Sequence, residues 1–289
     1  MAALDQSVAV RPGEHACSRL ARADDRRMFA RAFVRGGLAN GHKVVYLCDR
    51  DRDQVIADLS SQGDEVQPDD LIQAALASDQ LDIRGASETY MPDGTFDVEH
   101  MLRTARDEHD RALSEGYPAL SLTGEMAWAL CGAPGTERIT EYERRLDETA
   151  QEATLVILCQ YDHGGFAQGP LGDIAAAHSV DVSPELAPIA RTGYLLAART
   201  GGAGATLRLS GELDFACADV IAGVLHAHFH GPLRVDLTDL RYADVTGLRA
   251  LRGRKEQSLT IAGASEAVMR LVALLAWDTD SRVELAQAS

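Results

Sequence analysis

Apolar and polar positions in the first 160 residues change period several times, which is typical of helices alternating with strands. Residues Lys43–Cys48 form a short apolar run containing Val and Tyr, as expected of a strand buried on both faces. Before this run, Phe29 and Phe33 recur at the i,i+4 spacing of a helix that is predicted to begin at Asp24 and end at Asn40. Further helices are predicted around 55–63, 97–115 and 137–150, and further strands at 119–123 and 154–161. The alternation predicts a parallel sheet covered by helices on both faces.

The last 85 residues alternate in the same way over a shorter span. Strands are predicted at 207–209, 233–237, 259–262 and 283–285, and helices at 215–230 and 265–277. This pattern predicts a small α/β sandwich. Between the two halves, residues 163–204 are rich in Gly and Pro and lose their periodicity. We therefore expect an N-terminal domain at 1–180, a linker at 181–204 and a C-terminal domain at 205–289.

Charge agrees with this division. The 289 residues carry a net charge of −16, all of it within residues 1–190, because residues 191–289 contain equal numbers of acidic and basic side chains. A strongly acidic chain repels phosphate backbones and anionic lipid, so neither nucleic acid nor a membrane surface is an expected partner. With 46% hydrophobic and 25% charged residues, the composition is that of a globular protein.

The cysteines and the chain ends bear on the cellular compartment. Five cysteines are scattered along the chain without a CxxC pair, which favours reduced thiols over a disulfide framework or a zinc site. The first residues lack the basic and apolar regions of a signal peptide, and the apolar stretch at 267–277 is interrupted by Arg270. We expect a cytoplasmic protein without a membrane span.

Motifs for catalysis are absent from the sequence. The chain has two lysines, Lys43 and Lys255, and neither follows a glycine as the P-loop pattern GxxxxGK[ST] requires. GxGxxG, GxSxG and HExxH are also missing. His226, His228 and His230 could bind a metal through the first and last, but cationic side chains at a helix C-terminus explain them better. We therefore expect no enzyme activity, no cofactor and no metal site.

Polar and reactive residues at predicted strand ends are the candidates for a ligand pocket. Because ligands of parallel α/β sheets bind at the carboxyl ends of the strands, Cys48, Glu125, Tyr161 and Asp162 are expected around an apolar pocket. His15, two residues before Cys17, is a further candidate. The alternatives are that Glu125 and Asp162 are ordinary carboxylates at element ends and that the His15 segment is a structural strand or loop.

Several segments of the N-terminal half resemble the MEDS family, the sensory domains of methanogen/methylotroph dichloromethane-regulator proteins. They are GEHACSRLARADDRRMFARAFVRGGLANGHKVVYLCD, TGEMAWAL, EYERRLDE and VILCQYD, within residues 10–170. The resemblance implies a RecA-like three-layer α/β domain that lacks the phosphate loop and senses a small ligand.

The segments LRLSGELDFACADVIAGVL, LRVDLTDLRYADVTGLRAL and LTIAGASEAVMRLVALL resemble STAS domains, the fold of anti-sigma factor antagonists. In that family an Asp-Ser-x-Gly motif begins a helix, and a partner kinase, itself the anti-sigma factor, phosphorylates the serine. This chain has Asp244, Val245, Thr246 and Gly247 instead, so the acceptor position holds valine. Thr246 carries the one hydroxyl of the motif and is the candidate acceptor, with Arg249 to pair the phosphate. The alternative is that Thr246 only caps the helix.

These resemblances imply a cytoplasmic regulatory protein in which a ligand-sensing domain is coupled to a protein-binding domain in a partner-switching pathway. The implied partner is an anti-sigma factor or a serine/threonine kinase-like protein, the ligand is an unknown small molecule, and homo-oligomerisation stays open. The alternative is a RecA-like nucleotide-binding protein or ATPase with degenerate motifs.

Overall fold

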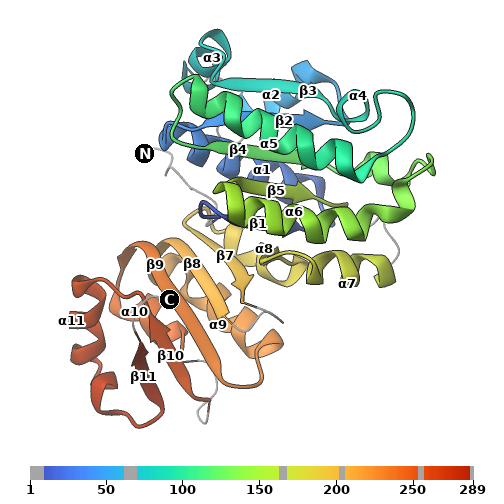
Figure 1. The fold of residues 1–289 in the computed structure, drawn as a ribbon. Coiled ribbons are helices and arrows are strands. Elements are labelled where there is room, and N and C mark those ends of the chain that lie inside the picture. The colour runs from blue at the N-terminus through green and yellow to red at the C-terminus, as the bar shows by residue number, and fades with distance from the viewer. Residues whose placement is uncertain (1–9, 62–69, 163–167, 202–205, 253–256, 287–289) are drawn as a thin grey trace. The chain divides into compact units, whose positions relative to one another are not determined.

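The computed structural model describes residues 10–61, 70–162, 168–201, 206–252 and 257–286. They form two compact units, which we call the N-terminal unit, up to Asp181, and the C-terminal unit, from Val182. Both combine helices with a largely parallel sheet, so the predicted α/β class is confirmed (Figure 1). No helix within the described ranges is long and apolar enough to cross a membrane.

The N-terminal unit is built on a sheet in the order β6-β1-β5-β4-β2-β3. Its strands are β1 (Glu14–Ser18), β2 (Lys43–Cys48), β3 (Leu81–Gly85), β4 (Leu120–Glu125), β5 (Val156–Gln160) and β6 (Val180–Val182). The pairs β1–β5, β5–β4, β4–β2 and β2–β3 are all parallel. The carboxyl ends of β1, β5, β4 and β2 therefore meet at one edge of the sheet, where parallel α/β domains bind their ligands.

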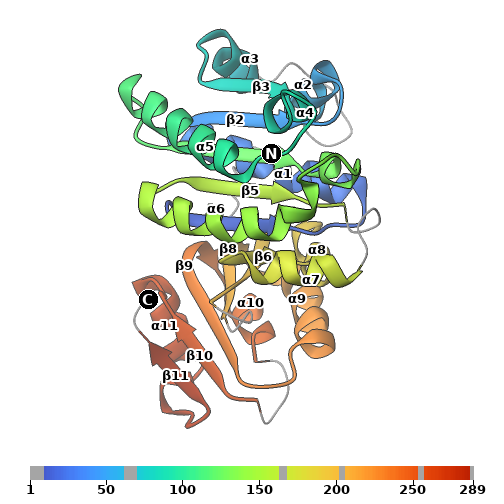
Figure 2. The ribbon, with the colours of Figure 1, turned by 45° about the vertical axis from the view of Figure 1, so that its right-hand side comes forward.

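Alternate residues of β2 enter two different cores. Val44 and Tyr46 pack with helices on one face, whereas Val45 and Leu47 pack with helices on the other. The first face is covered by α1 (Ala23–Ala39), α2 (Arg52–Ser60) and α3 (Asp70–Ala77). The second is covered by α4 (Ala86–Tyr90), α5 (Val98–Ser114), α6 (Ile139–Ala153) and α7 (Gln168–Ala176) (Figure 2). Two short 3₁₀ turns, Ala127–Leu130 and Thr136–Arg138, follow β4.

The C-terminal unit has the strand order β7-β8-β9-β10-β11. The strands are β7 (Leu195–Thr200), β8 (Thr206–Leu213), β9 (Leu233–Ala243), β10 (Leu259–Ala262) and β11 (Val283–Ala286). β7 pairs antiparallel with β8, and the other pairs are parallel. The helices are α8 (Ala187–Ala190), α9 (Phe215–His228), α10 (Val245–Ala250) and α11 (Glu266–Leu274), with 3₁₀ turns at Pro184–Leu186 and Trp277–Thr279.

The segment predicted as a linker, residues 181–204, is largely structured, which corrects that expectation. It contains α8 and β7, and Leu195 and Ala197 of β7 are buried in the core of the C-terminal unit with Leu186 and Ile189. The glycines and prolines that suggested a linker surround a short apolar run, and that run forms β7, which pairs antiparallel with β8.

We predict that a C-terminal fragment needs this segment to fold. Removal of residues 182–204 deletes three large apolar side chains from the core, each worth about 1.5–3 kcal/mol. That loss is comparable with the whole stability of a small domain, about 5–15 kcal/mol. Fragment 182–289 should therefore unfold cooperatively in urea, whereas fragment 205–289 should show no cooperative transition by circular dichroism. Equal midpoints for the two fragments would contradict the structural role of β7.

Candidate functional site

A cavity of about 230 Å³ opens at the carboxyl edge of the N-terminal sheet. It lies beside the start of α1 and the ends of β2, β4 and β5. Six charged side chains line it: Arg26, Arg27, Asp49, Arg50, Glu125 and Asp162. The cavity lies at the predicted edge, and its remaining lining residues, Ala23, Met126, Ala127 and Gln160, add apolar surface between the charged groups. The strand ends carry Asp49, Arg50 and Glu125, and these bring polar atoms to the rim.

Glu125, a predicted pocket residue, joins two strand ends. Its carboxylate accepts hydrogen bonds from Tyr46 Oη at 3.0 Å, from the Asp49 backbone N–H at 2.9 Å and from Arg50 Nε at 2.9 Å. Arg50 also donates to Asp58 at 2.6 Å. Glu125 therefore fixes the turn after β2 and aims Arg50 at the cavity, so it is a positioning group.

Two groups at this rim have shifted pKa values. Burial raises the pKa of Asp49 to about 6, and the negative charge of Glu125 adds to this effect, while the backbone N–H of Trp128 opposes it. Burial, with the Glu125 charge, also raises the pKa of Tyr46 above its ordinary range. Asp49 is thus a carboxyl group at the rim whose pKa is raised although part of the residue is exposed.

The connection between β1 and α1 occupies the place of a phosphate-binding loop and lacks its features. It consists of residues 19–22, which include no glycine. The carbonyl oxygens of Leu20 and Ala21 point to Arg26, whose guanidinium donates to both at 2.9 Å and to Asp162 at 3.1 Å. A phosphate site presents backbone N–H groups to its ligand, whereas this loop directs these carbonyl groups at an arginine. The geometry therefore does not suit a nucleotide phosphate.

The other predicted pocket residues are not all at the cavity. Asp162 lines it and pairs with Arg26. The Cys48 side chain is turned into the core and donates to the Arg84 carbonyl oxygen at 3.3 Å. His15 and Tyr161 are buried on the α6 side of the sheet, where the Tyr161 hydroxyl donates a short hydrogen bond to Glu143 Oε1.

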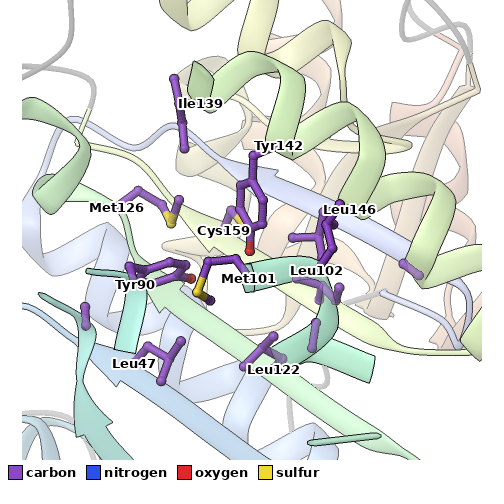
Figure 3. Close-up of a cluster of buried hydrophobic side chains, with 14 of the residues drawn as sticks. Leu47, Tyr90, Met101, Leu102, Leu122, Met126, Ile139, Tyr142, Leu146 and Cys159 are labelled. Atoms are coloured by element: carbon purple, nitrogen blue, oxygen red, sulfur yellow. The ribbon is translucent and has the colours of Figure 1, made fainter. Parts of the chain in front are cut away.

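His15 and Tyr161 belong to a buried polar cluster that sequence reasoning missed. Its other members are Glu143 on α6, Cys159 on β5 and His178, which follows α7. Burial lowers the pKa of His15, and burial raises the pKa of the Cys159 thiol. Burial opposes the ionisation of Glu143, but the imidazoles of His178 and His15 outweigh it and lower the pKa of this carboxyl. Cys159 also borders the apolar core, where it lies near Tyr142 (Figure 3).

In the C-terminal unit, Asp244 and Gly247 build the turn that begins α10. Asp244 accepts hydrogen bonds from the Gly247 backbone N–H at 2.7 Å and from the Phe215 backbone N–H at 3.1 Å. A Cβ atom on Gly247 would lie 2.1 Å from the Leu213 carbonyl oxygen, so the close approach of β8 requires glycine. Both residues therefore have structural roles in this turn.

Thr246 is exposed at the start of α10, as a phospho-acceptor must be, and Arg249 is exposed on the same helix. Arg252 is engaged with Asp280 at 3.1 Å. Arg254 and Lys255, which would add to a basic surface, lie outside the described residues. His226, His228 and His230 are exposed at the end of α9.

The observations define a two-unit protein: a parallel α/β unit with a ligand-sized cavity at its carboxyl edge, and a smaller α/β unit with an Asp-capped turn. The chain belongs to the MEDS family, the methanogen/methylotroph, DcmR sensory domain, whose profile matches residues 14–179. Residues 196–286 match the Mlab, STAS domain, so a STAS domain follows the sensory domain. No curated protein matches the chain.

Solved structures of similar fold are distant. The flagellar accessory protein FlaH from Methanocaldococcus jannaschii has 12% identity and a TM-score of 0.43, with 66% of this chain and 79% of that chain covered. A KaiC-like protein from Pyrococcus horikoshii has 13% identity and a TM-score of 0.42, with 59% of this chain and 71% of that chain covered.

The raised pKa of Asp49 predicts a pH-dependent stability. Because the folded-state pKa, about 6, exceeds the ordinary value of 3.8, the folded protein binds this proton more tightly than the unfolded chain. Stability from this group therefore rises as pH falls from about 7 to about 4. Asp49→Asn removes the titration. The melting temperature of the variant minus that of the wild type should be largest above about pH 7 and shrink through about pH 6. If the melting temperatures of the wild type and Asp49→Asn change with pH in the same way, the raised pKa of Asp49 is contradicted.

The close approach at Gly247 predicts a costly substitution. Gly247→Ala places a methyl group against the Leu213 carbonyl and should destabilise the protein by about 1–3 kcal/mol in urea unfolding. Gly223→Ala is the matched control, because Gly223 lies inside α9 with no atom within 4 Å of an added Cβ. The control should stabilise by about 0.5–1 kcal/mol. Similar effects of the two substitutions would show that the turn can relax.

Proposed function

We propose that this protein is a cytoplasmic regulator in which the MEDS unit senses a small ligand and the STAS unit binds a protein partner, with no catalysis of its own. The observation that carries the proposal is an exposed aromatic surface around the Asp244 turn. Phe215 is 72% exposed and Tyr242 is 53% exposed. We call Phe215, Tyr242 and Thr246 the docking surface.

The three residues of the docking surface adjoin the same turn. Phe215 follows β8 and donates its backbone N–H to Asp244, and Tyr242 lies two residues before Asp244. Exposed aromatic side chains are enriched where proteins bind one another, because they bury large areas with little loss of entropy. Their position beside the turn that carries the phospho-acceptor in STAS domains supports a partner whose binding responds to that turn.

The partner we propose is an anti-sigma-factor-like serine/threonine kinase, in a partner-switching pathway that regulates transcription. Phosphorylation of Thr246 would add about −1.5 to −2 charges next to two exposed aromatic rings. Bringing that charge into an apolar contact costs free energy, so the phosphorylated form would release the partner. Val245 at the usual acceptor position leaves Thr246 as the hydroxyl that the motif offers.

For the sensor unit, the charged lining indicates the kind of ligand. A molecule that fits about 230 Å³ must satisfy guanidinium and carboxylate groups at once, so we propose a small polar ligand with both donor and acceptor groups. The connection between β1 and α1 does not support nucleotide hydrolysis, because its backbone carbonyl groups bind Arg26.

We predict that the docking surface controls partner capture. Phe215→Ser with Tyr242→Ser should reduce capture of a kinase-like partner from native cytoplasm by at least about tenfold, as expected when interface aromatics are lost. Thr246→Glu should weaken capture, and Thr246→Ala should remove phosphate from the intact mass of protein isolated from native cells. Quantitative mass spectrometry of the captured proteins provides the measurement.

Leu274→Ser is the matched control, because Leu274 is 77% exposed but lies on α11. It should leave capture unchanged. Undiminished capture by the double aromatic variant would refute the docking surface. Absence of phosphate at Thr246, together with equal capture by wild type, Thr246→Ala and Thr246→Glu, would refute the switch and leave a constitutive binding module.

A further inference from the structure

Four side chains with metal-binding atoms converge in the interior of the N-terminal unit. They are His15 on β1, Glu143 on α6, Cys159 on β5 and His178 after α7, and their donor atoms all lie within 4.8 Å of one another. The side chains of His15, Glu143 and His178 have no exposed surface, and Cys159 is 2% exposed. The group lies on the α6 side of the sheet, apart from the charged cavity.

Four of the six distances between the donor atoms are close to those of a tetrahedral ion, and the other two are below 4.8 Å. His15 Nε2 lies 3.2 Å from both Glu143 Oε2 and Cys159 Sγ. Glu143 Oε2 lies 3.3 Å from His178 Nε2 and 3.6 Å from Cys159 Sγ. A tetrahedral zinc ion, with bonds of about 2.0–2.1 Å to nitrogen or oxygen and about 2.3 Å to sulfur, separates its donors by about 3.3–3.6 Å.

His178 contributes a nitrogen that can bind a metal ion to this group. Its Nδ1 lies 2.7 Å from the Ile174 carbonyl oxygen, an acceptor, so Nδ1 carries the proton in the neutral ring. Its Nε2 is buried and makes no hydrogen bond within the described part of the chain. This Nε2 lies 3.3 Å from Glu143 Oε2, which is an acceptor. The contact is favourable when Nε2 carries a proton, which makes the ring cationic, or when a metal ion binds both atoms.

Neighbouring groups hold the ligands in place. The Tyr161 hydroxyl donates to Glu143 Oε1, which leaves Oε2 directed at the other donors. The Ile174 carbonyl oxygen lies 2.7 Å from the outer nitrogen of His178, which is the usual support of a metal-binding histidine. Asp147 Oδ1 accepts from the Ser179 backbone N–H and lies 4.0 Å from His15 Nδ1, beyond hydrogen-bond distance.

We propose that His15, Glu143, Cys159 and His178 bind one zinc ion in a closed tetrahedral site. Thiolate and imidazole ligands favour zinc over Mg²⁺ and Ca²⁺, which prefer oxygen. Four protein ligands leave no coordination position for a substrate, so the site is structural. Binding forms the Zn–S bond as the Cys159 thiol loses its proton to solvent. The ion ties β1 and the segment after α7 to β5 and α6.

The test uses the full-length chain, purified in buffer without chelator. Elemental analysis should find about one zinc per chain in the wild type. Replacement by Co²⁺ should give the intense visible bands of a tetrahedral site and a thiolate-to-cobalt band in the near ultraviolet. Cys159→Ser should lose the thiolate band and bind zinc at least about tenfold more weakly in competition with a chromophoric chelator. Cys48→Ser, a buried thiol in another core, is the matched control and should keep both properties.

If Cys159→Ser fails to fold, measurements on the wild-type protein still test the proposal. Chelator treatment should lower its melting temperature, and added zinc should restore it. A wild type that purifies without metal and gives no cobalt–thiolate band would overturn the proposal and leave a proton-bridged network. An unchanged band in Cys159→Ser would assign the thiolate to another cysteine and overturn the ligand set. Neither outcome bears on the docking surface of the STAS unit.

Discussion

A carboxylate with no exposed surface, that of Glu143, sets the strongest constraint on the N-terminal unit. A charge buried in a protein interior costs several kcal/mol unless polar partners surround it. Here the partners are Tyr161, His15, Cys159 and His178, contributed by β1, by β5 and its end, and by the segment after α7. Because His15 and His178 lie at opposite ends of this unit's sequence, both ends must be in place before the charge is satisfied. The first strand and the segment after α7 are thereby linked to α6.

The same requirement to satisfy charge governs the cavity at the carboxyl edge. Four of its six charged side chains are paired within the wall, Arg26 with Asp162 and Arg50 with Glu125. These four side chains are 14–43% exposed, so water can solvate each of them where a ligand displaces its partner. The ligand proposed above has donor and acceptor groups, which can take the place of either partner in a pair.

The sequence predicts those elements whose pattern has a single explanation. The run Lys43–Cys48 and the helix over 24–40 are both found, because continuous apolar runs and i,i+4 pairs each indicate one structure. β3, with the sequence LDIRG, and β7, set among Gly and Pro, are missed since their short patterns fit a loop equally well.

For the site, strand ends predict where a cavity opens but not which way a side chain turns. Glu125 and Asp162 line it, whereas Cys48 turns into the core. The buried cluster leaves no local motif, as His15 and Cys159 stand 144 positions apart. The cluster can be recognised only from the tertiary contacts of the folded chain.

The Asp-x-x-Gly turn of the C-terminal unit shows why a retained motif is weak evidence for a retained switch. Asp244 caps α10 and also binds the Phe215 backbone N–H, and Gly247 is required by the approach of β8. Both residues would be kept by the fold even if no phosphate were ever attached. The acceptor position, which is Val245 in this chain, makes neither of these contacts.

The aromatic residues beside the turn are different, because exposure of large apolar side chains costs solubility and contributes nothing to the core. Among the features of this turn, Phe215 and Tyr242 therefore give the strongest support for a binding partner.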